Sequence, residues 1–277
     1  MTETKLSSQE RFAFGKNWLD FLRILSDAHV YEAEKSLKGF LGNYDLTEKH
    51  FLDIGSGSGL HSLAARRLGA NVHAFDYDLQ SVACTEELKR RYYPGDDHWK
   101  IEQGSILDRD YIKNLGIFDV SYAWGVLHHT GALWQALYNA QIPLPVGGLL
   151  FIAIYNDQGL ISKIWKIIKR TYCTNRIGHG LVVGIFYPLF FLSGLIMDLV
   201  HLRNPRTRYQ DHKKYRGMSL THDWRDWLGG YPYEPAKPQE IISFFKNLGF
   251  ELMQFKPTGH GFGNNQFLFQ RIRSNHE

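Results

Sequence analysis

The chain has 277 residues, of which 44% are hydrophobic and 22% are charged. This balance is typical of one large globular domain with room for an insertion, and it argues against an extensively disordered chain. The net charge of +4 is too small to indicate a nucleic-acid partner by itself. Cys84 and Cys173 are far apart and outside any metal-ligand spacing, so we expect neither a disulfide scaffold nor a metal site.

The N-terminal region, 1–45, begins with polar residues and shows no apolar segment typical of a secretory signal, so a cytoplasmic location is expected. Residues 11–22 combine several aromatic side chains with a Gly-Lys-Asn sequence. One interpretation is an amphipathic helix that packs on the edge of a sheet. The other is a helical lid that places Asn17 and Trp18 over a bound ligand.

Residues 46–156 alternate short apolar runs with helical patterns, which predicts a parallel sheet with right-handed helical crossovers. Residues 157–217 look helical and carry no strand signals. The chain then returns, over 218–277, to an aromatic loop, a helix and two strands. We therefore expect one α/β domain with a helical insertion at 157–217 and antiparallel strands that complete the sheet.

A glycine-rich loop, "GSGSG" at 55–59, follows the first of these strands. Leu60 stands where a dinucleotide-binding loop has its third glycine, and a phosphate-binding loop would need a lysine that is absent. Asp53 precedes the loop and suits a ligand that carries an ammonium group. Asp76 closes the second strand, where a carboxylate can accept hydrogen bonds from ribose hydroxyls. Together these residues predict a ribonucleoside that bears an amino acid and no phosphates.

Four stretches carry a family resemblance: "FLDIGSGSG", "VHAFDYD", "EQGSILD" and the segment from "FDVSYAWGV" to "PVGGLLFIAIYND". In this order they resemble the class I S-adenosylmethionine-dependent methyltransferases over residues 51–155. The small-molecule type related to the ubiquinone-biosynthesis methylases looks most similar. The resemblance implies a Rossmann-like fold, with a seven-stranded, mostly parallel sheet and an antiparallel terminal strand, and S-adenosylmethionine as cofactor.

Carried over position by position, the resemblance implies that the glycine loop contacts the methionine part of the cofactor. It implies that Asp76 binds the ribose and that Ser105 and Ile106 flank the adenine, although the family more often has Asp where Ser105 stands. The full set expected to bind the cofactor is Asn17, Trp18, Asp53, Gly55, Ser56, Gly57, Gly59, Asp76, Tyr77, Ser105, Ile106 and Trp124.

Two stretches offer candidates for the acceptor site. "WGVLHHTG" at 124–131 follows the fourth strand, where this fold places its acceptor, and only one of the adjacent His128 and His129 can face a pocket. Tyr155 ends the fifth strand at the same rim. The second stretch, 220–238, is interpreted as an irregular loop. It forms either an aromatic mini-core or a pocket wall in which His222 acts as a base oriented by Asp223.

An apolar run at 181–200 lies between basic segments at 162–170 and 201–216. It could be a pair of cap helices over an apolar pocket, an interfacial helix on a membrane, or a membrane-spanning helix. Pro188 and positive charge at both ends argue against the span. Peripheral membrane contact through 177–216 is therefore one expectation for this region.

The sequence thus predicts an enzyme that transfers a methyl group by in-line displacement to a small or amphiphilic, lipid-like acceptor through an oxygen, sulfur or carbon nucleophile. Two alternatives stay open. One is a non-catalytic S-adenosylmethionine-binding module that docks on a membrane or a protein. The other is an RNA methyltransferase, which is less favoured because no RNA-binding module accompanies the basic segments; no DNA partner is expected.

Overall fold

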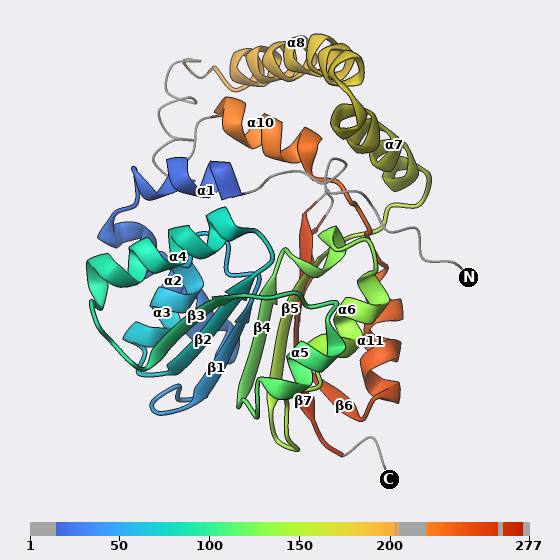
Figure 1. The fold of residues 1–277 in the computed structure, drawn as a ribbon. Helices are drawn as coiled ribbons and strands as arrows, with labels where there is room; N and C mark the ends of the chain where they lie inside the picture. Colours follow the sequence, from blue (N-terminus) through green and yellow to red (C-terminus); the bar gives the residue numbers. More distant parts are fainter. Residues whose placement is uncertain (1–14, 203, 205–219, 260–262, 274–277) are drawn as a thin grey trace.

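The computed structural model describes residues 15–202, 204, 220–259 and 263–273 (Figure 1). Its centre is a seven-stranded sheet with the order β3-β2-β1-β4-β5-β7-β6. β1 to β5 run parallel, and β7 pairs antiparallel with both β5 and β6. The strands are β1 (His50–Ile54), β2 (Asn71–Asp76), β3 (Trp99–Gln103), β4 (Val120–Trp124), β5 (Leu149–Tyr155), β6 (Phe250–Lys256) and β7 (Asn264–Arg271). The predicted fold is confirmed.

Helices cover both faces of the sheet (Figure 1). One layer consists of α2 (Asp27–Leu41), α3 (Leu60–Arg67) and α4 (Leu79–Tyr92), and the other of α5 (Arg109–Asn114), α6 (Leu133–Ala140) and α11 (Pro238–Asn247). Successive strand residues point to opposite layers. Each layer encloses its own hydrophobic core. Phe51 and Phe151 lie in the core under α2, α3 and α4, and Leu52 and Leu150 lie in the core under α5, α6 and α11. The apolar runs are continuous because these strands are buried on both faces.

A further group of helices lies beyond the carboxyl ends of the parallel strands: α1 (Gly15–Leu22), α7 (Leu160–Thr174), α8 (Arg176–Val200) and α10 (Leu220–Gly229) (Figure 1). α7 and α8 form the described part of the helical insertion. The region expected to form an N-terminal lid, 1–45, contains two described helices. α1 lies at the carboxyl ends of the strands, whereas α2 packs on the sheet through Val30, Leu37 and Phe40.

The prediction of an irregular loop over 220–238 is wrong for its first half, because residues 220–229 form α10. Trp224, Trp227 and Leu228 have the spacing of one helical face. Trp224 contacts the rings of Tyr187 and Phe190, and Leu228 is buried in the same cluster. The aromatic residues therefore stabilise a helix between α7 and α8, and the irregular segment begins only after Gly229.

Candidate active site

A cleft of about 750 Å³ opens at the carboxyl ends of β1, β2 and β4. It lies at the point where the strand order reverses between β1 and β4, which is where open α/β sheets bind their ligands. Most of the residues expected at the site line it: Trp18, Asp53, Gly55, Ser56, Gly57, Asp76, Tyr77, Ser105, Ile106, Trp124 and His129.

The glycine loop between β1 and α3 follows a path that side chains would obstruct. Gly55, Gly57 and Gly59 have φ angles of 72°, 56° and 78°, in the left-handed region that favours glycine. A Cβ atom on Gly55 would lie 2.5 Å from a Val126 methyl group, and one on Gly59 would lie 2.9 Å from Thr85. Gly59 does not line the cleft. It is the N-cap residue of α3 and shapes the loop, and its expected contact with the cofactor stays a prediction.

Asp76 is fixed by the loop that it faces. Its Oδ2 accepts a hydrogen bond of 3.0 Å from the backbone N–H of Gly57, and its Oδ1 accepts one of 2.9 Å from that of Asp78. Burial raises the pKa of this carboxyl group to about 6, although the backbone hydrogen bonds lower it. A ligand that donates hydrogen bonds to Asp76 would therefore favour its ionised form.

Asp53 lies deeper in the same cleft. The hydroxyl of Ser62 donates a 2.5 Å hydrogen bond to Oδ2 of Asp53. Burial raises the pKa of Asp53 to about 7, the Ser62 hydrogen bond lowers it, and the nearby Asp76 raises it further. None of the described residues that line the cleft is Lys or Arg. The cleft therefore suits a cationic ligand without phosphate groups.

Helix α1 borders the cleft beside the glycine loop. A Cβ atom on Gly57 would lie 3.1 Å from Nε1 of Trp18, so the indole ring stands directly against this glycine. The backbone N–H of Gly15 donates a 3.0 Å hydrogen bond to Oδ2 of Asp78 and holds α1 to the start of α4. Asn17 belongs to α1, but its side chain lies outside the described residues.

His129 lies on the opposite wall. Its Nδ1 is 2.6 Å from the carbonyl oxygen of Pro232. Because a carbonyl oxygen only accepts hydrogen bonds, Nδ1 carries the proton, and Nε2 is the acceptor nitrogen of the neutral ring. Burial lowers the pKa of His129 to about 4; the charge of Lys169 also lowers it, and the Pro232 carbonyl opposes the shift. His129 therefore presents a neutral imidazole at neutral pH.

His128 and Tyr155, which were expected to act directly, lie behind this wall and do not line the cleft. His128 is fully buried, and its ring packs 4.2 Å from that of Tyr155 and 4.4 Å from that of His129, measured between centroids. The N–H of Tyr155 points to Nδ1 of His128 at 3.4 Å. Both residues thus support His129 from behind. The prediction of a direct role for them is corrected, because His128 points into the core and the half-buried Tyr155 packs against His128, Trp227 and Tyr233 outside the cleft.

A family model described as a methyltransferase domain matches residues 52–150, the part of the chain that holds the glycine loop, Asp76 and His129. The chain carries a class I S-adenosylmethionine-dependent methyltransferase domain. The narrower resemblance to the ubiquinone-biosynthesis methylases stays a prediction. No curated protein sequence matches the chain significantly.

Solved structures share the fold of this methyltransferase. Magnesium protoporphyrin IX methyltransferase from Synechocystis PCC 6803, with bound S-adenosylhomocysteine, is 12% identical with a TM-score of 0.53, over 88% of this chain and 83% of that one. An O-methyltransferase family protein from Burkholderia thailandensis is 12% identical with a TM-score of 0.52, over 91% and 59%. The cyclase SpnF is 11% identical with a TM-score of 0.53, over 85% and 80%. At these identities the likeness concerns the fold alone.

S-adenosylmethionine is the cofactor of this methyltransferase family, and the cleft fits it. Gly55 and Gly57 line the cleft without side chains and with positive φ angles, so a ligand can approach the backbone of the loop. Asp53 and Asp76 add two carboxyl groups to the lining, one suited to the ammonium group and the other to the ribose hydroxyls. Tyr77 and Leu79 leave exposed apolar surface at the rim near Ser105 and Ile106, on the side expected to hold the adenine.

Sequence reasoning missed several residues of the methyltransferase cleft: Phe21, His61, Asp78, Gln103, Tyr122, Val126 and Thr130. His61 packs near the rings of Tyr122 and Trp124, at 5.1 and 6.0 Å between centroids, and burial lowers its pKa to about 4. Its place in the first turn after the glycine loop was a usable signal. Tyr231 and Pro232 also line the cleft, and they belong to the stretch 220–238 for which a pocket wall was one of the two interpretations.

The second acceptor candidate, the His222–Asp223 pair, belongs to α10 by its backbone, while both side chains lie outside the described residues. The pair therefore stays a prediction for the acceptor site. In the part of the chain that the structure describes, no group of His, Cys, Asp or Glu side chains is arranged to hold a metal ion.

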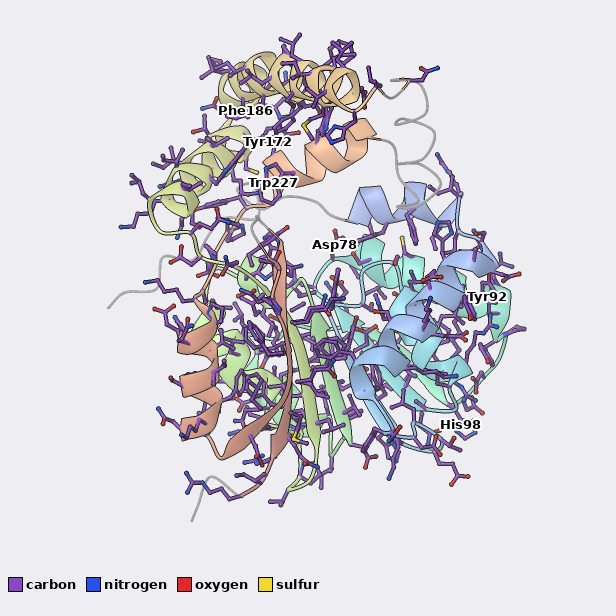
Figure 2. The ribbon with its side chains drawn as sticks, turned by 180° about the vertical axis from the view of Figure 1, so that it is seen from behind. Asp78, Tyr92, His98, Tyr172, Phe186 and Trp227 are labelled. Carbon is purple, nitrogen blue, oxygen red and sulfur yellow. The ribbon has the colours of Figure 1, made fainter. Side chains whose placement is uncertain are left out.

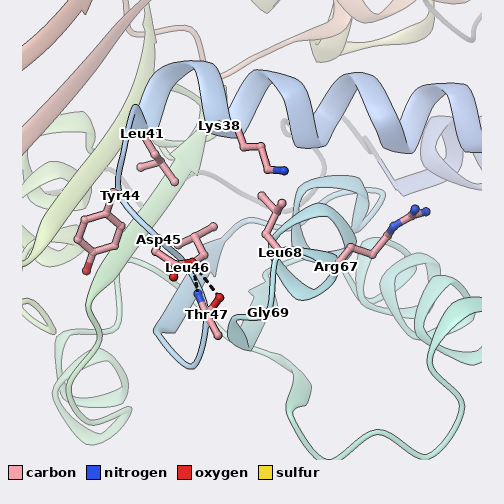
Figure 3. Close-up of a pocket in the computed structure, with 9 residues that line it drawn as sticks. All are labelled: Lys38, Leu41, Tyr44, Asp45, Leu46, Thr47, Arg67, Leu68 and Gly69. Atoms are coloured by element: carbon pink, nitrogen blue, oxygen red, sulfur yellow. Dashed lines mark hydrogen bonds between the residues drawn. The ribbon is translucent and has the colours of Figure 1, made fainter.

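A second recess, of about 430 Å³, lies at the opposite edge of the sheet (Figure 3). It is bordered by Thr47 and Gly69, which precede β1 and β2, and by Lys38 and Arg67. Arg67 pairs with Glu34 at 2.7 Å. The recess shares no residue with the cleft and offers no arrangement of groups that the methyltransferase reaction needs.

Proposed function

We propose that this chain transfers a methyl group from S-adenosylmethionine to a small or amphiphilic acceptor by in-line displacement. The observation that carries the proposal is a single cleft whose floor is the glycine loop with Asp53 and Asp76, and whose far wall holds His129. The cofactor supplies an activated methyl group. The task of the protein is to hold an acceptor atom in line with that methyl group, and this alignment provides much of the rate enhancement.

On the cofactor side, the carboxylate of Asp76 would accept hydrogen bonds from the ribose hydroxyls. Asp53 would hold the ammonium group of the methionine part through its carboxylate. The backbone of the glycine loop would lie against the same part, with Trp18 covering it. These roles follow from the positions of the side chains in the cleft.

On the acceptor side, Nε2 of His129 would accept a hydrogen bond from an acceptor hydroxyl. With a pKa of about 4 the imidazole is too weak a base to ionise a phenol, whose pKa is about 10, before reaction. It can take the proton as the new oxygen–carbon bond forms, because the hydroxyl then becomes a strong acid. His129 would first orient the acceptor and then remove its proton late in the reaction.

A small or lipid-like acceptor is supported by the aromatic side chains that line the cleft, which include Trp124, Tyr122 and Tyr231. The Synechocystis relative acts, by its name, on magnesium protoporphyrin IX, a small molecule. We further propose a cytoplasmic protein in peripheral contact with a membrane, since an amphiphilic acceptor would reside there.

The name of the structural relative SpnF denotes a cyclase, so the fold alone does not exclude a use other than methyl transfer.

The deciding experiment incubates the purified chain with S-adenosylmethionine labelled in its methyl group, together with small-molecule and lipid extracts. We expect label in an extractable product and inhibition by S-adenosylhomocysteine. Cofactor binding without any transfer of label, across phenolic, thiol and lipid acceptors, would favour the non-catalytic module. Label found only in added RNA would favour the RNA methyltransferase.

A further inference from the structure

Helices α7, α8 and α10 form a small packed unit above the cleft. Their facing sides enclose a cluster in which Tyr172, Val182 and Leu228 are buried. Figure 2 shows Tyr172, Phe186 and Trp227 between the three helices. The ammonium group of Lys169, on α7, donates a hydrogen bond to the carbonyl oxygen of Trp227 on α10 and lies 4.2 Å from the centroid of its ring. These contacts fix which sides of α7 and α8 face outward.

The outward side of α8 is apolar along its whole length. Large apolar residues recur at intervals of three or four positions, and each is between 49% and 85% exposed: Ile177, Leu181, Ile185, Leu189, Leu192, Ile196 and Leu199. This spacing places them on one face of the helix. α8 is long and apolar enough to cross a membrane, yet only 11% of its most apolar window is buried. Exposed apolar surface of this extent marks an interaction site.

α7 extends this face and adds positive charge. Leu160, Ile164 and Ile167 are exposed and share one side of the helix. Beside them, Lys163, Lys166 and Arg170 are also exposed and follow the same helical spacing. The acidic residue of α8, Asp198, is buried. The stretch that follows α8 in sequence, 201–216, contains six Lys or Arg residues and one acidic residue.

We propose that the outward sides of α7 and α8 dock on the surface of an anionic lipid bilayer, with α8 lying in the plane of the headgroups. An apolar face bordered by basic residues is the pattern of helices that bind such surfaces. α8 does not span the bilayer in this arrangement, because its inner side, with Val182 and Phe186, belongs to the packed unit with α7 and α10.

The docking surface deepens the proposed function, on which this step rests. α10 leads directly into Tyr231 and Pro232, which form the wall of the cleft beside His129. A bilayer held against α7 and α8 would therefore lie near the acceptor side of the cleft. The acceptor class favoured by this arrangement is an amphiphile that is anchored in the bilayer and presents its polar end to His129.

The experiment measures sedimentation of the full chain with vesicles of phosphatidylcholine alone or mixed with phosphatidylglycerol, without any cofactor. We expect binding to the mixed vesicles that weakens as salt is raised. Leu181→Glu/Ile196→Glu should abolish binding. Ile117→Glu/Val146→Glu, which changes two apolar residues that are at least as exposed and lie just before β4 and β5, should bind as the wild type does. Lys163→Gln/Lys166→Gln/Arg170→Gln should weaken binding by at least about tenfold.

Thermal unfolding and S-adenosylhomocysteine binding check that each variant is folded. The charge variant, Lys163→Gln/Lys166→Gln/Arg170→Gln, tests the surface even if Leu181→Glu/Ile196→Glu does not fold.

The proposal is overturned if the wild type does not bind anionic vesicles, or if a folded Leu181→Glu/Ile196→Glu variant sediments like the wild type. Resistance to extraction by high salt and alkaline carbonate would indicate a spanning helix and would also contradict it. A stable dimer that buries this face and does not bind vesicles would assign the face to a second copy. Vesicle binding needs no methyl transfer, so failure here is distinct from failure of the proposed reaction.

Discussion

His129 donates a 2.6 Å hydrogen bond from Nδ1–H to the carbonyl oxygen of Pro232, a residue 103 positions further along the chain. This contact joins the turn after β4 to the segment that follows α10. It fixes the tautomer of the imidazole and turns Nε2 into the acceptor nitrogen. The helical unit above the sheet is therefore connected to the group that we propose to contact the acceptor.

Replacement of His129 by Ala should lower kcat about 100-fold, at the low end of what a positioned acid–base group contributes. Affinity for S-adenosylhomocysteine should stay within about twofold, because His129 serves the acceptor side. The pKa of His129 is lowered to about 4, so its neutral base form is present above that pH. The part of kcat that depends on His129 should therefore be lost only as the pH falls through about 4. His98→Ala, at an exposed site in the turn before β3, is the matched control. An unchanged kcat in a folded His129→Ala variant would remove His129 from the reaction.

Cofactor affinity should rise with pH between about 5.5 and 8. In the free protein the pKa of Asp53 is raised to about 7 and that of Asp76 to about 6, so binding at lower pH must first remove protons. A ligand ammonium group favours the ionised carboxylate, so the pKa of Asp53 falls in the complex. Affinity levels off only when the pH exceeds the pKa of Asp53 in the free protein, at about pH 8. Calorimetry in buffers of different ionisation heat measures the proton release. Asp53→Asn should flatten most of the slope, and an equally steep slope in that variant would contradict the assignment.

Gly55→Ala should destabilise the fold by about 1–3 kcal/mol, because it forces a side chain into a left-handed conformation. Its Cβ atom would also meet Val126 at 2.5 Å. Gly39→Ala offers a matched control within α2, since a Cβ atom there meets nothing within 4 Å. We expect that variant to gain about 0.4–1 kcal/mol. Thermal or urea unfolding measures both changes, and equal stability of the two variants would show that the loop tolerates side chains.

Trp18→Ala should weaken binding of S-adenosylmethionine by about tenfold, because the indole ring covers the glycine loop and offers a ring face to a sulfonium cation. S-adenosylhomocysteine, whose thioether sulfur carries no charge, should lose less affinity. Trp134→Ala, on α6 and outside the cleft, is the control for loss of a partly exposed tryptophan. If Trp18→Ala binds both ligands as tightly as the wild type, α1 is no lid.

The sheet and the cofactor side of the cleft could be predicted because their signals are local. A glycine loop after a buried strand, with an aspartate at the end of the next strand, requires only that neighbouring parallel strands end at one edge. Asp76 and Gly57 are close for this reason, and their hydrogen bond follows from the topology.

The acceptor side could not be predicted in the same way, because it is assembled from segments far apart in sequence. Pro232 meets His129 only after the whole insertion has packed, and no spacing in the sequence encodes that contact. The glycines and prolines around α10 masked a helix whose stability comes from Trp224 and Trp227 packing on α7 and α8. The adjacent His128 and His129 indicated that only one ring can face the cleft, but not which one. The direction of a short turn depends on the segments that pack against it.

The central claim is that the cleft binds S-adenosylmethionine through Asp76 and the glycine loop. Isothermal titration of S-adenosylhomocysteine tests it most directly, with Asp110→Ala as the control for loss of an exposed carboxylate on α5. We predict one-to-one binding by the wild type and by Asp110→Ala. Affinity should be about 10- to 100-fold weaker in Asp76→Ala, as expected for hydrogen bonds lost from a charged group. No binding by the wild type, or equal affinity of Asp76→Ala and Asp110→Ala, would contradict the account.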